Sequence, residues 1–181
     1  DRIIKLAKKL YHGPNLVLMG GCALNCVANS NVTGNYGFTN TWIMPNPGDA
    51  GSCIGVAQKY NSDWTLDWKT PYLGHNIEGE YPVEKSLKAL LDGEIIGIAN
   101  GRAEFGPRAL GNRSLLADPR GHDIKDKVNA IKKRQKFRPF APVILAEHAR
   151  DYFEMSWEDS PYMQYTSRCK YPDLFPAIVH A

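Results

Sequence analysis

Residues 94–120 read EIIGIANGRAEFGPRALGNRSLLADPR, and this stretch decides the fold class. Residues 94–99 are largely apolar and typical of a buried strand, and residues 114–117 predict a second strand that Asp118-Pro119 ends. The loop between them, residues 101–114, holds three glycines, three arginines and one glutamate. Glycines let backbone N–H groups approach a ligand, and arginine binds phosphate or carboxylate through two parallel hydrogen bonds. The loop is therefore a candidate anion site at the carboxyl end of a strand, and a loop whose arginines form surface ion pairs fits equally well.

Helices and strands alternate on both sides of this stretch. Apolar spacing predicts helices over residues 3–11, 22–31, 52–59, 83–91, 123–133 and 147–153. Short apolar runs predict strands over residues 15–19, 41–44, 94–99, 114–117 and 142–146. The alternation favours an α/β fold, and a polar, aromatic-rich connector from about residue 61 to residue 80 divides the chain into two segments.

Composition narrows the possible functions. The 181 residues suffice for one ordinary domain or two small or incomplete ones, and a net charge of +3 is too weak to indicate nucleic acid or an anionic membrane as a partner. No apolar run approaches the roughly 20 residues that span a bilayer. The four cysteines lack CxxC spacing, so we expect reduced thiols and a cytoplasmic location. Because the first residue is not Met and already continues a helical pattern, we expect a fragment or a processed chain.

Two glycine turns are further candidate sites. Residues 20–25, GGCALN, follow a predicted strand and start a helix, a geometry that suits a nucleotide and that tight packing of helix on strand explains equally well. Residues 48–52, GDAGS, place Asp49 in a turn before a helix. Asp49 is a candidate ligand for a divalent metal or a contact for a nucleotide hydroxyl, but the residues alone favour a helix cap.

A basic cluster follows the helix predicted over residues 123–133. It comprises Lys132, Lys133, Arg134, Lys136 and Arg138. A solvated helix end explains such a cluster without any ligand, and nucleic-acid binding would need a matching basic stripe elsewhere. Arg138 differs because two aromatic residues and two prolines surround it and stiffen its backbone.

Four motifs occur in a fixed order along the chain: GGCALN at 20–25, GDAGSCIGVA at 48–57, GRAEFGPRALGNRSLLADPR at 101–120 and FRPFAP at 137–142. This series resembles the carbamoyltransferase family of nodulation-factor and antibiotic-tailoring enzymes, to which the tobramycin-type and cephamycin-type O-carbamoyltransferases belong. The resemblance covers nearly the whole chain, and its two arginine motifs are long and specific.

The resemblance implies a domain organisation and a reaction. Residues 1–62 would be the C-terminal part of an ASKHA-type (actin-like, RNase H-like) carbamoyl-transfer domain, residues 63–80 a connector, and residues 81–181 the N-terminal part of a YrdC-like domain. The YrdC-like domain would activate carbamoyl phosphate with ATP to carbamoyl-adenylate and release pyrophosphate. The ASKHA-type domain would then move the carbamoyl group to the hydroxyl of a small-molecule acceptor, which the sequence does not identify.

The resemblance also implies residue roles. The candidate catalytic residues are Arg108, Lys132, Arg138 and Glu104, of which the three basic ones would bind the phosphates of carbamoyl phosphate and ATP. The candidate ATP-binding residues are Gly20, Gly21, Asn25, Gly48, Gly51 and Arg113. Asp49 would be a ligand of a divalent metal, Fe²⁺ or Mg²⁺. We expect Glu104 to orient an arginine rather than to act as a base, and a structural role for Arg113 stays open.

Two departures from the family pattern make both expected sites incomplete. The family's HxxxH metal motif and its DGTAR-like segment do not occur in the chain. We therefore expect the 181 residues alone to be weakly active or inactive, and exposed apolar surface to cause self-association. The competing hypotheses are a truncated nucleotide- or anion-binding module without turnover and a nucleic-acid-binding domain that uses residues 132–138.

Overall fold

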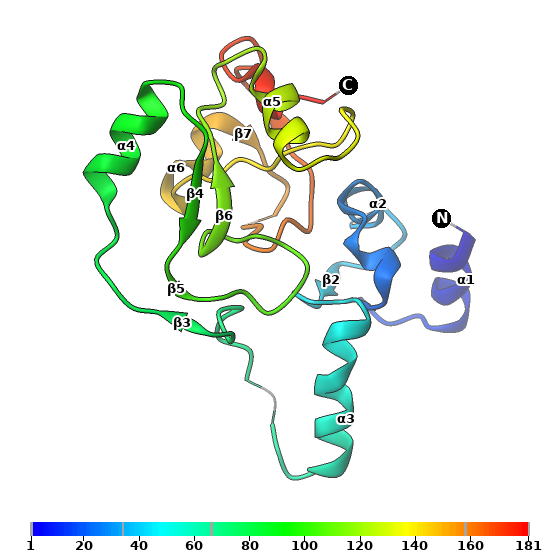
Figure 1. The fold of residues 1–181 in the computed structure, drawn as a ribbon. Helices are drawn as coiled ribbons and strands as arrows, with labels where there is room; N and C mark the ends of the chain where they lie inside the picture. Colours follow the sequence, from blue (N-terminus) through cyan, green and yellow to red (C-terminus); the bar gives the residue numbers. More distant parts are fainter. Residues whose placement is uncertain (1, 34, 66, 158, 181) are drawn as a thin grey trace. The chain divides into compact units, whose positions relative to one another are not determined.

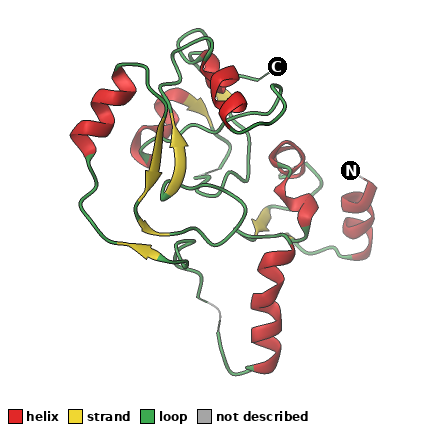
Figure 2. Cartoon of the chain, viewed as in Figure 1, coloured by secondary structure: helices red, strands yellow, loops and turns green. Residues whose placement is uncertain are grey.

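The computed structural model describes residues 2–33, 35–65, 67–157 and 159–180 (Figure 1). Their contacts define two compact units. The first unit comprises Asp1–Pro71, Phe105–Arg108 and Ser160–Thr166, and the second comprises Tyr72–Glu104, Ala109–Asp159 and Ser167–Ala181. Both units mix helices with short strands (Figure 2), so the α/β prediction is confirmed at the level of a mixed helix and strand fold. The ASKHA-type and YrdC-like assignments stay predictions.

The first unit is built on a parallel pair of strands. In chain order its elements are α1 (Arg2–Leu10), β1 (Asn15–Leu18), the 3-10 helix η1 (Gly21–Leu24), α2 (Cys26–Val32), β2 (Asn40–Ile43), the 3-10 helix η2 (Asp49–Gly51) and α3 (Ser52–Tyr60). Strands β1 and β2 run parallel, with Leu18 opposite Ile43. Buried apolar side chains of this unit are Ala23, Val32, Phe38, Ile43 and Met44. The side chain of Lys8 stands over the Phe38 ring, with Nζ 4.6 Å from its centroid, and closes one side of this core.

A distant segment of the chain completes the first unit. The Nε2 of Gln164 donates to the carbonyl of Ile43 at 2.7 Å, and the Nδ2 of the buried Asn29 donates to the carbonyl of Gln164 at 3.0 Å. The backbone N–H of Thr166 donates to Ser30 Oγ at 2.8 Å. Residues 160–166 are therefore an integral part of the unit that the first 71 residues form.

The second unit contains three antiparallel strand pairs. Its elements are β3 (Asn76–Ile77), α4 (Val83–Leu91), β4 (Ile96–Ala99), β5 (Gly101–Arg102), β6 (Arg113–Leu116), α5 (Ile124–Ile131), α6 (Ala146–Tyr152), β7 (Phe153–Glu154), β8 (Arg168–Cys169) and the 3-10 helix η3 (Pro176–Ile178). The pairs are β3 with β5, β4 with β6, and β7 with β8. Ile124, Val128 and Ala177 form the buried core of this unit, against which Ile95, Ala117 and Phe140 pack.

Most predicted elements are present, and three predictions are corrected. The helix predicted over residues 22–31 is divided at Asn25, whose extended backbone separates η1 from α2. The strand predicted over residues 142–146 is wrong: Val143 is 80% exposed, and Pro142 cannot donate to a ladder. The arginine loop does not sit on an open parallel sheet, because β4 and β6, the strands that flank it, pair antiparallel.

No helix within the described ranges is long and apolar enough to cross a membrane.

Candidate functional site

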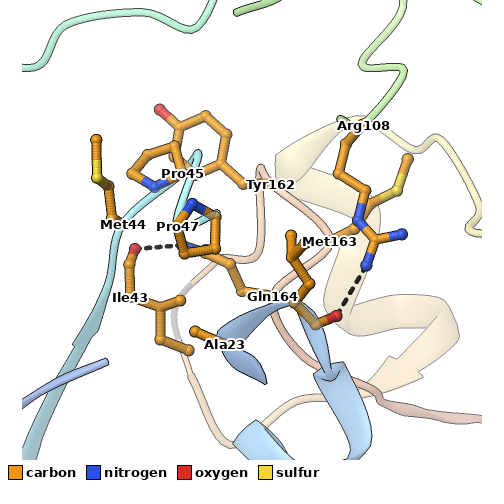
Figure 3. Close-up of a pocket in the computed structure, with 10 residues that line it drawn as sticks. Ala23, Ile43, Met44, Pro45, Pro47, Arg108, Tyr162, Met163 and Gln164 are labelled. Atoms are coloured by element: carbon orange, nitrogen blue, oxygen red, sulfur yellow. Dashed lines mark hydrogen bonds between the residues drawn. The ribbon is translucent and has the colours of Figure 1, made fainter. Parts of the chain in front are cut away.

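Arg108 of the arginine loop lies against the glycine turn of the first unit. Its Nη2 donates to the carbonyl of Leu24 at 2.8 Å, and the two residues share a small cavity with Ile43, Pro45, Tyr162 and Gln164 (Figure 3). Leu24 belongs to the GGCALN motif and Arg108 to the arginine loop, and Pro47, which also lines the cavity, directly precedes GDAGS. Three of the four family-like motifs therefore lie in this cavity or next to it. The cavity measures about 10 Å³, which is room for about one water molecule.

Several polar atoms of the first unit are buried and lack a partner among the described residues. They are Arg108 Nε, Thr41 Oγ1, and both Oδ1 and Nδ2 of Asn46, a residue that is 1% exposed. An unpaired buried polar group costs about 1–3 kcal/mol, so such groups in native proteins call for a specific explanation. A water or a small polar ligand at Arg108 would lower this cost.

Gly106 allows the FGPR segment to approach Asn46. Its φ is +138°, and an added Cβ would lie 3.3 Å from both Cβ and Cγ of Asn46. Gly51 meets the same residue from another side, since an added Cβ there would lie 1.8 Å from the carbonyl oxygen of Asn46. Asn46 is thus enclosed by two glycines whose lack of a side chain is a steric requirement. Asn46 is not among the site residues predicted from the sequence, although its position between two prolines marks a rigid turn.

The outer face of the turn at Gly20 and Gly21 is open. An added Cβ at either glycine would meet nothing within 4 Å, and the Gly20 N–H donates to the carbonyl of Pro47 at 2.7 Å. The Asn25 side chain caps α2, because its Oδ1 accepts the N–H of Ala28 at 3.0 Å. Tight packing of a neighbour therefore does not explain why residues 20 and 21 are glycines. Because the Asn25 oxygen caps α2, a contact between Asn25 and a nucleotide would use its amide nitrogen. The nucleotide-binding role of Gly20, Gly21 and Asn25 stays a prediction.

Asp49 is exposed at the first position of η2 and does not cap a helix. Neither η2 nor α3 has a side-chain cap hydrogen bond, so the interpretation that the residues alone favoured is wrong. Gly48, which precedes Asp49, has extended backbone and serves as the N-cap position of η2. Within the ranges that the structure describes, no three His, Cys, Asp or Glu residues cluster as metal ligands. Asp49 as a metal ligand stays a prediction, and the described residues do not complete its site.

The Glu104 carboxylate accepts hydrogen bonds from three backbone amides of the arginine loop. Its Oε1 accepts the N–H groups of Leu110 at 2.7 Å, Asn112 at 2.9 Å and Arg113 at 3.2 Å. Burial raises the pKa of Glu104, but the backbone N–H groups outweigh burial and hold the pKa below its usual value. A carboxylate with a lowered pKa is a poor general base. The partners of Glu104 are backbone groups, so the expectation that Glu104 orients an arginine side chain is corrected. Glu104 instead stabilises the conformation of the loop.

Arg102 and Arg113 of the arginine loop hold backbone segments together. Arg113 donates from Nη1 to the carbonyls of Asn100 and Asn112 at 2.9 and 2.7 Å, and from Nη2 to those of His75 and Gly101 at 3.0 and 3.2 Å. Arg102 donates to the carbonyls of Leu73 and Gly74. Both guanidinium groups join loop segments through carbonyls, in contrast to the surface ion pairs that the composition also allowed. An ATP contact by Arg113 is correspondingly disfavoured.

Lys132 and Arg138 are exposed on the chain that follows α5. Lys132 is the C-cap residue of that helix, and Arg138 donates from Nε to Gln135 Oε1 at 2.9 Å. Both belong to the second unit and Arg108 to the first, so the predicted grouping of the three basic residues into one phosphate site stays a prediction. Asn129 and Arg134 hold the segment that carries Arg138. The sequence indicated Arg134 only as a member of the basic cluster and gave no signal for Asn129.

Comparison with known proteins identifies the family. Residues 2–58 match the family model described as carbamoyltransferase N-terminus, and residues 87–181 match the one described as carbamoyltransferase C-terminus. Nodulation protein U of Sinorhizobium fredii is 36% identical over 197 residues, which cover 97% of this chain and 35% of that protein. Nodulation protein NolO of Bradyrhizobium diazoefficiens is 35% identical over 197 residues, covering 91% of this chain and 36% of that protein.

An uncharacterized protein of Synechocystis sp. is similar to the same degree. It is 38% identical over 196 residues, which cover 89% of this chain and 32% of that protein. The chain thus spans about a third of the length of the curated relatives that it matches. Because both family models match and one of them covers more than half of the 181 residues, the chain belongs to the carbamoyltransferase family.

Proposed function

We propose that the chain is part of an O-carbamoyltransferase that activates carbamoyl phosphate with ATP to carbamoyl-adenylate and transfers the carbamoyl group to a substrate hydroxyl. The observation that carries this proposal is the match of one chain to both the N-terminal and the C-terminal carbamoyltransferase models. We assign the N-terminal match to an ASKHA-type transfer domain and the C-terminal match to a YrdC-like adenylating domain.

The activation step defines what the residues must do. Water first hydrolyses carbamoyl phosphate to carbamate and inorganic phosphate, and a carbamate oxygen then attacks the α-phosphorus of ATP. The bond from that phosphorus to the bridging oxygen of the β-phosphate breaks, and pyrophosphate leaves. Negative charge accumulates on phosphate oxygens throughout, so fixed cations stabilise the transition state without any proton transfer.

Lys132 and Arg138 are suited to this task in the second unit. Both are exposed, and the structure gives no ion pair for either within its described ranges. The Nε of Arg138 is held by Gln135, and its two terminal nitrogens remain for a bidentate contact with phosphate oxygens. These features support an anion site that uses the two side chains.

Arg108 and the open glycine turn are suited to the nucleotide in the first unit. The guanidinium of Arg108 reaches the turn through Leu24, and the outer face of Gly20 and Gly21 leaves room for a ribose or phosphate oxygen. The residues fit ATP in this limited sense. They do not fit a complete metal centre, since no three His, Cys, Asp or Glu residues cluster within the described residues.

A pyrophosphate-release assay tests the proposed function. ATP, carbamoyl phosphate and Mg²⁺ are supplied to the unmodified chain, to Lys132→Ala and Arg138→Ala, and to Lys136→Gln as a control that also loses one positive charge. We expect slow release that depends on carbamoyl phosphate, at least tenfold reduced in the first two variants and retained in the control. Release that continues without carbamoyl phosphate would contradict adenylation of the carbamoyl group.

A second candidate function is a nucleotide- or anion-binding module without turnover. The observation in its favour is that the glycine turn at Gly20 and Gly21 is open to a ligand, whereas no three possible metal ligands cluster within the described residues. Saturable ATP binding to the chain, with no pyrophosphate release under any of the above conditions, would favour this module over the enzyme.

A further inference from the structure

Asn129 is the most completely buried polar side chain of α5. It is 0% exposed, and each polar atom of its side chain is used. Its Nδ2 donates to the carbonyl of Lys136 at 3.1 Å and to the carbonyl of Arg138 at 3.2 Å. Its Oδ1 accepts the Nε–H of Arg134 at 2.6 Å. One buried amide thus holds the backbone of the segment that follows the helix at two points.

Arg134 extends this network to the FRPFAP motif. Besides its bond to Asn129, its Nη2 donates to the carbonyl of Pro139 at 3.3 Å, and its guanidinium carbon lies 4.5 Å from the centre of the Phe140 ring. A planar guanidinium can stack on an aromatic ring and donate in its own plane at once, which an ammonium group cannot do. The residue therefore fastens both ends of the turn around Arg138.

The backbone between Asn129 and Arg134 adopts a strained turn. Lys133 has φ 51°, in the left-handed region that favours glycine. The N–H of Lys133 donates to the carbonyl of Ala130 at 3.0 Å, and the N–H of Arg134 donates to that of Asn129 at 3.1 Å, which is the paired pattern of a Schellman helix end. A lysine in this conformation lowers stability relative to glycine. Such strain is frequent near functional sites.

Arg134 and Arg138 lie on one short segment, and neither forms an ion pair among the described residues. Burial, and after it the positive charge of Arg138, lowers the pKa of Arg134. The nearest acid that pairs with this segment, Asp126, contacts Lys136 with Nζ to Oδ2 at 3.3 Å. Like charges on one segment repel each other, so a bound anion would stabilise this arrangement.

We propose that Asn129 and Arg134 are positioning residues, which hold the turn of residues 135–140 so that the Arg138 guanidinium is already oriented for a phosphate group. The buried amide sets the backbone at Arg138, Arg134 fixes Pro139 and Phe140, and Gln135 directs the Arg138 side chain. An oriented cation binds an anion more tightly because less side-chain freedom is lost on binding. This inference rests on the proposed function in one respect, the assignment of Arg138 to phosphate.

A double-mutant cycle on the chain tests the proposal, with ATP and inorganic pyrophosphate as the probes in titration calorimetry. The variants are Arg134→Gln, Arg138→Gln, the double variant, and Lys136→Gln as the matched control for loss of one charge two residues away. Arg134→Lys tests the fork of the guanidinium at constant charge and keeps the test open if Arg134→Gln fails to fold. We expect Arg134→Gln and Arg134→Lys to weaken binding about tenfold and Lys136→Gln less than threefold.

The coupling in the cycle separates positioning from a direct contact. Because Arg134 acts through Arg138, adding Arg134→Gln to Arg138→Gln should weaken binding no further. Additive losses would overturn the proposal.

Amide hydrogen exchange supplies a readout that needs no ligand. We expect exchange in a peptide covering residues 135–141 to rise about tenfold in Arg134→Lys, while α5 stays protected and Lys136→Gln matches the unmodified chain. Unchanged exchange in Arg134→Lys would overturn the proposal. If exchange rises but Arg138→Gln leaves the affinity for both probes unchanged, the proposed phosphate role of Arg138 fails, whereas the positioning of the turn by Arg134 stands.

Discussion

Glu104 and Leu110 stand six residues apart and are joined by a hydrogen bond of 2.7 Å from the Leu110 N–H to the Glu104 carboxylate. Asn112 and Arg113 donate their N–H groups to the same oxygen. The loop therefore satisfies the backbone N–H groups on either side of Gly111 with its own carboxylate. Any anion contact of the loop would therefore fall to side chains such as Arg108, which is outside this network and donates to the carbonyl of Leu24.

Replacing Glu104 by Gln tests the internal anion. Because the folded-state pKa of Glu104 is lowered, ionised Glu104 stabilises the fold above its unfolded pKa of about 4.3, and this contribution is lost as pH falls through the lower folded pKa. We expect Glu104→Gln to lower the free energy of unfolding by about 1–2 kcal/mol at pH 7 and by less at pH 3, as measured by urea titration. Exposed Glu94→Gln is the control and should change it by less than about 0.5 kcal/mol. A difference that persists at pH 3 would contradict the role of the ionised group.

Replacing Gly106 by Ala tests the approach of FGPR to Asn46. A φ of +138° and a contact of 3.3 Å both disfavour a Cβ at this position. We expect a loss of about 1–3 kcal/mol in the free energy of unfolding. Gly55→Ala in α3 is the matched control: an added Cβ there meets nothing within 4 Å, and helix propensity predicts a gain of up to about 1 kcal/mol. Equal effects of the two substitutions, measured by thermal unfolding, would refute this steric account.

Replacing Arg113 by Lys separates structure from ligand binding. Lysine cannot reproduce four hydrogen bonds from a planar fork to the carbonyls of His75, Asn100, Gly101 and Asn112. We expect a loss of about 1–3 kcal/mol in unfolding free energy, with ATP affinity of the folded variant within twofold of the unmodified chain. Normal stability together with weakened ATP binding would restore Arg113 as a nucleotide contact.

Replacing Asp49 by Asn tests the metal assignment without relying on activity. Since Asp49 makes no cap hydrogen bond to η2 or α3, the substitution should change the free energy of unfolding by less than about 0.5 kcal/mol. A titration with Mn²⁺ should show weaker binding in the variant, because an amide oxygen replaces a carboxylate. Equal Mn²⁺ affinity in both chains would remove Asp49 from the list of candidate ligands.

The exposed apolar face of α4 predicts self-association. Val83, Leu87 and Leu91 follow one another at four-residue spacing and are 58%, 49% and 61% exposed. We expect the mean mass in light scattering to rise with concentration, and Leu87→Glu to reduce this rise. Lys85→Glu, which changes charge on the same helix without touching the three apolar residues, should not have the same effect. A mass that stays constant in the unmodified chain would contradict the expectation.

The sequence by itself determined the local elements, because their signals lie within a few residues. Leu87, Leu90 and Leu91 recur at helical spacing, and α4 spans Val83–Leu91 as predicted. Apolar runs predicted β1, β2, β4 and β6 to within two residues at either end. The same runs misled at residues 142–146, where apolar residues have no partner strand. The order of four motifs was also sufficient to indicate the family, which both family models confirm.

Only the tertiary structure decided which polar groups satisfy one another. Leu24 and Arg108, or Ile43 and Gln164, lie far apart in sequence, and no periodicity links them. In the sequence Asn129 is an ordinary helical residue. Only the structure shows that its side chain is buried and donates to the carbonyls of Lys136 and Arg138. The spacing of residues along the chain indicates which face of a helix or strand is apolar. The acceptor of a buried donor is decided by packing, and packing depends on all segments of the chain together.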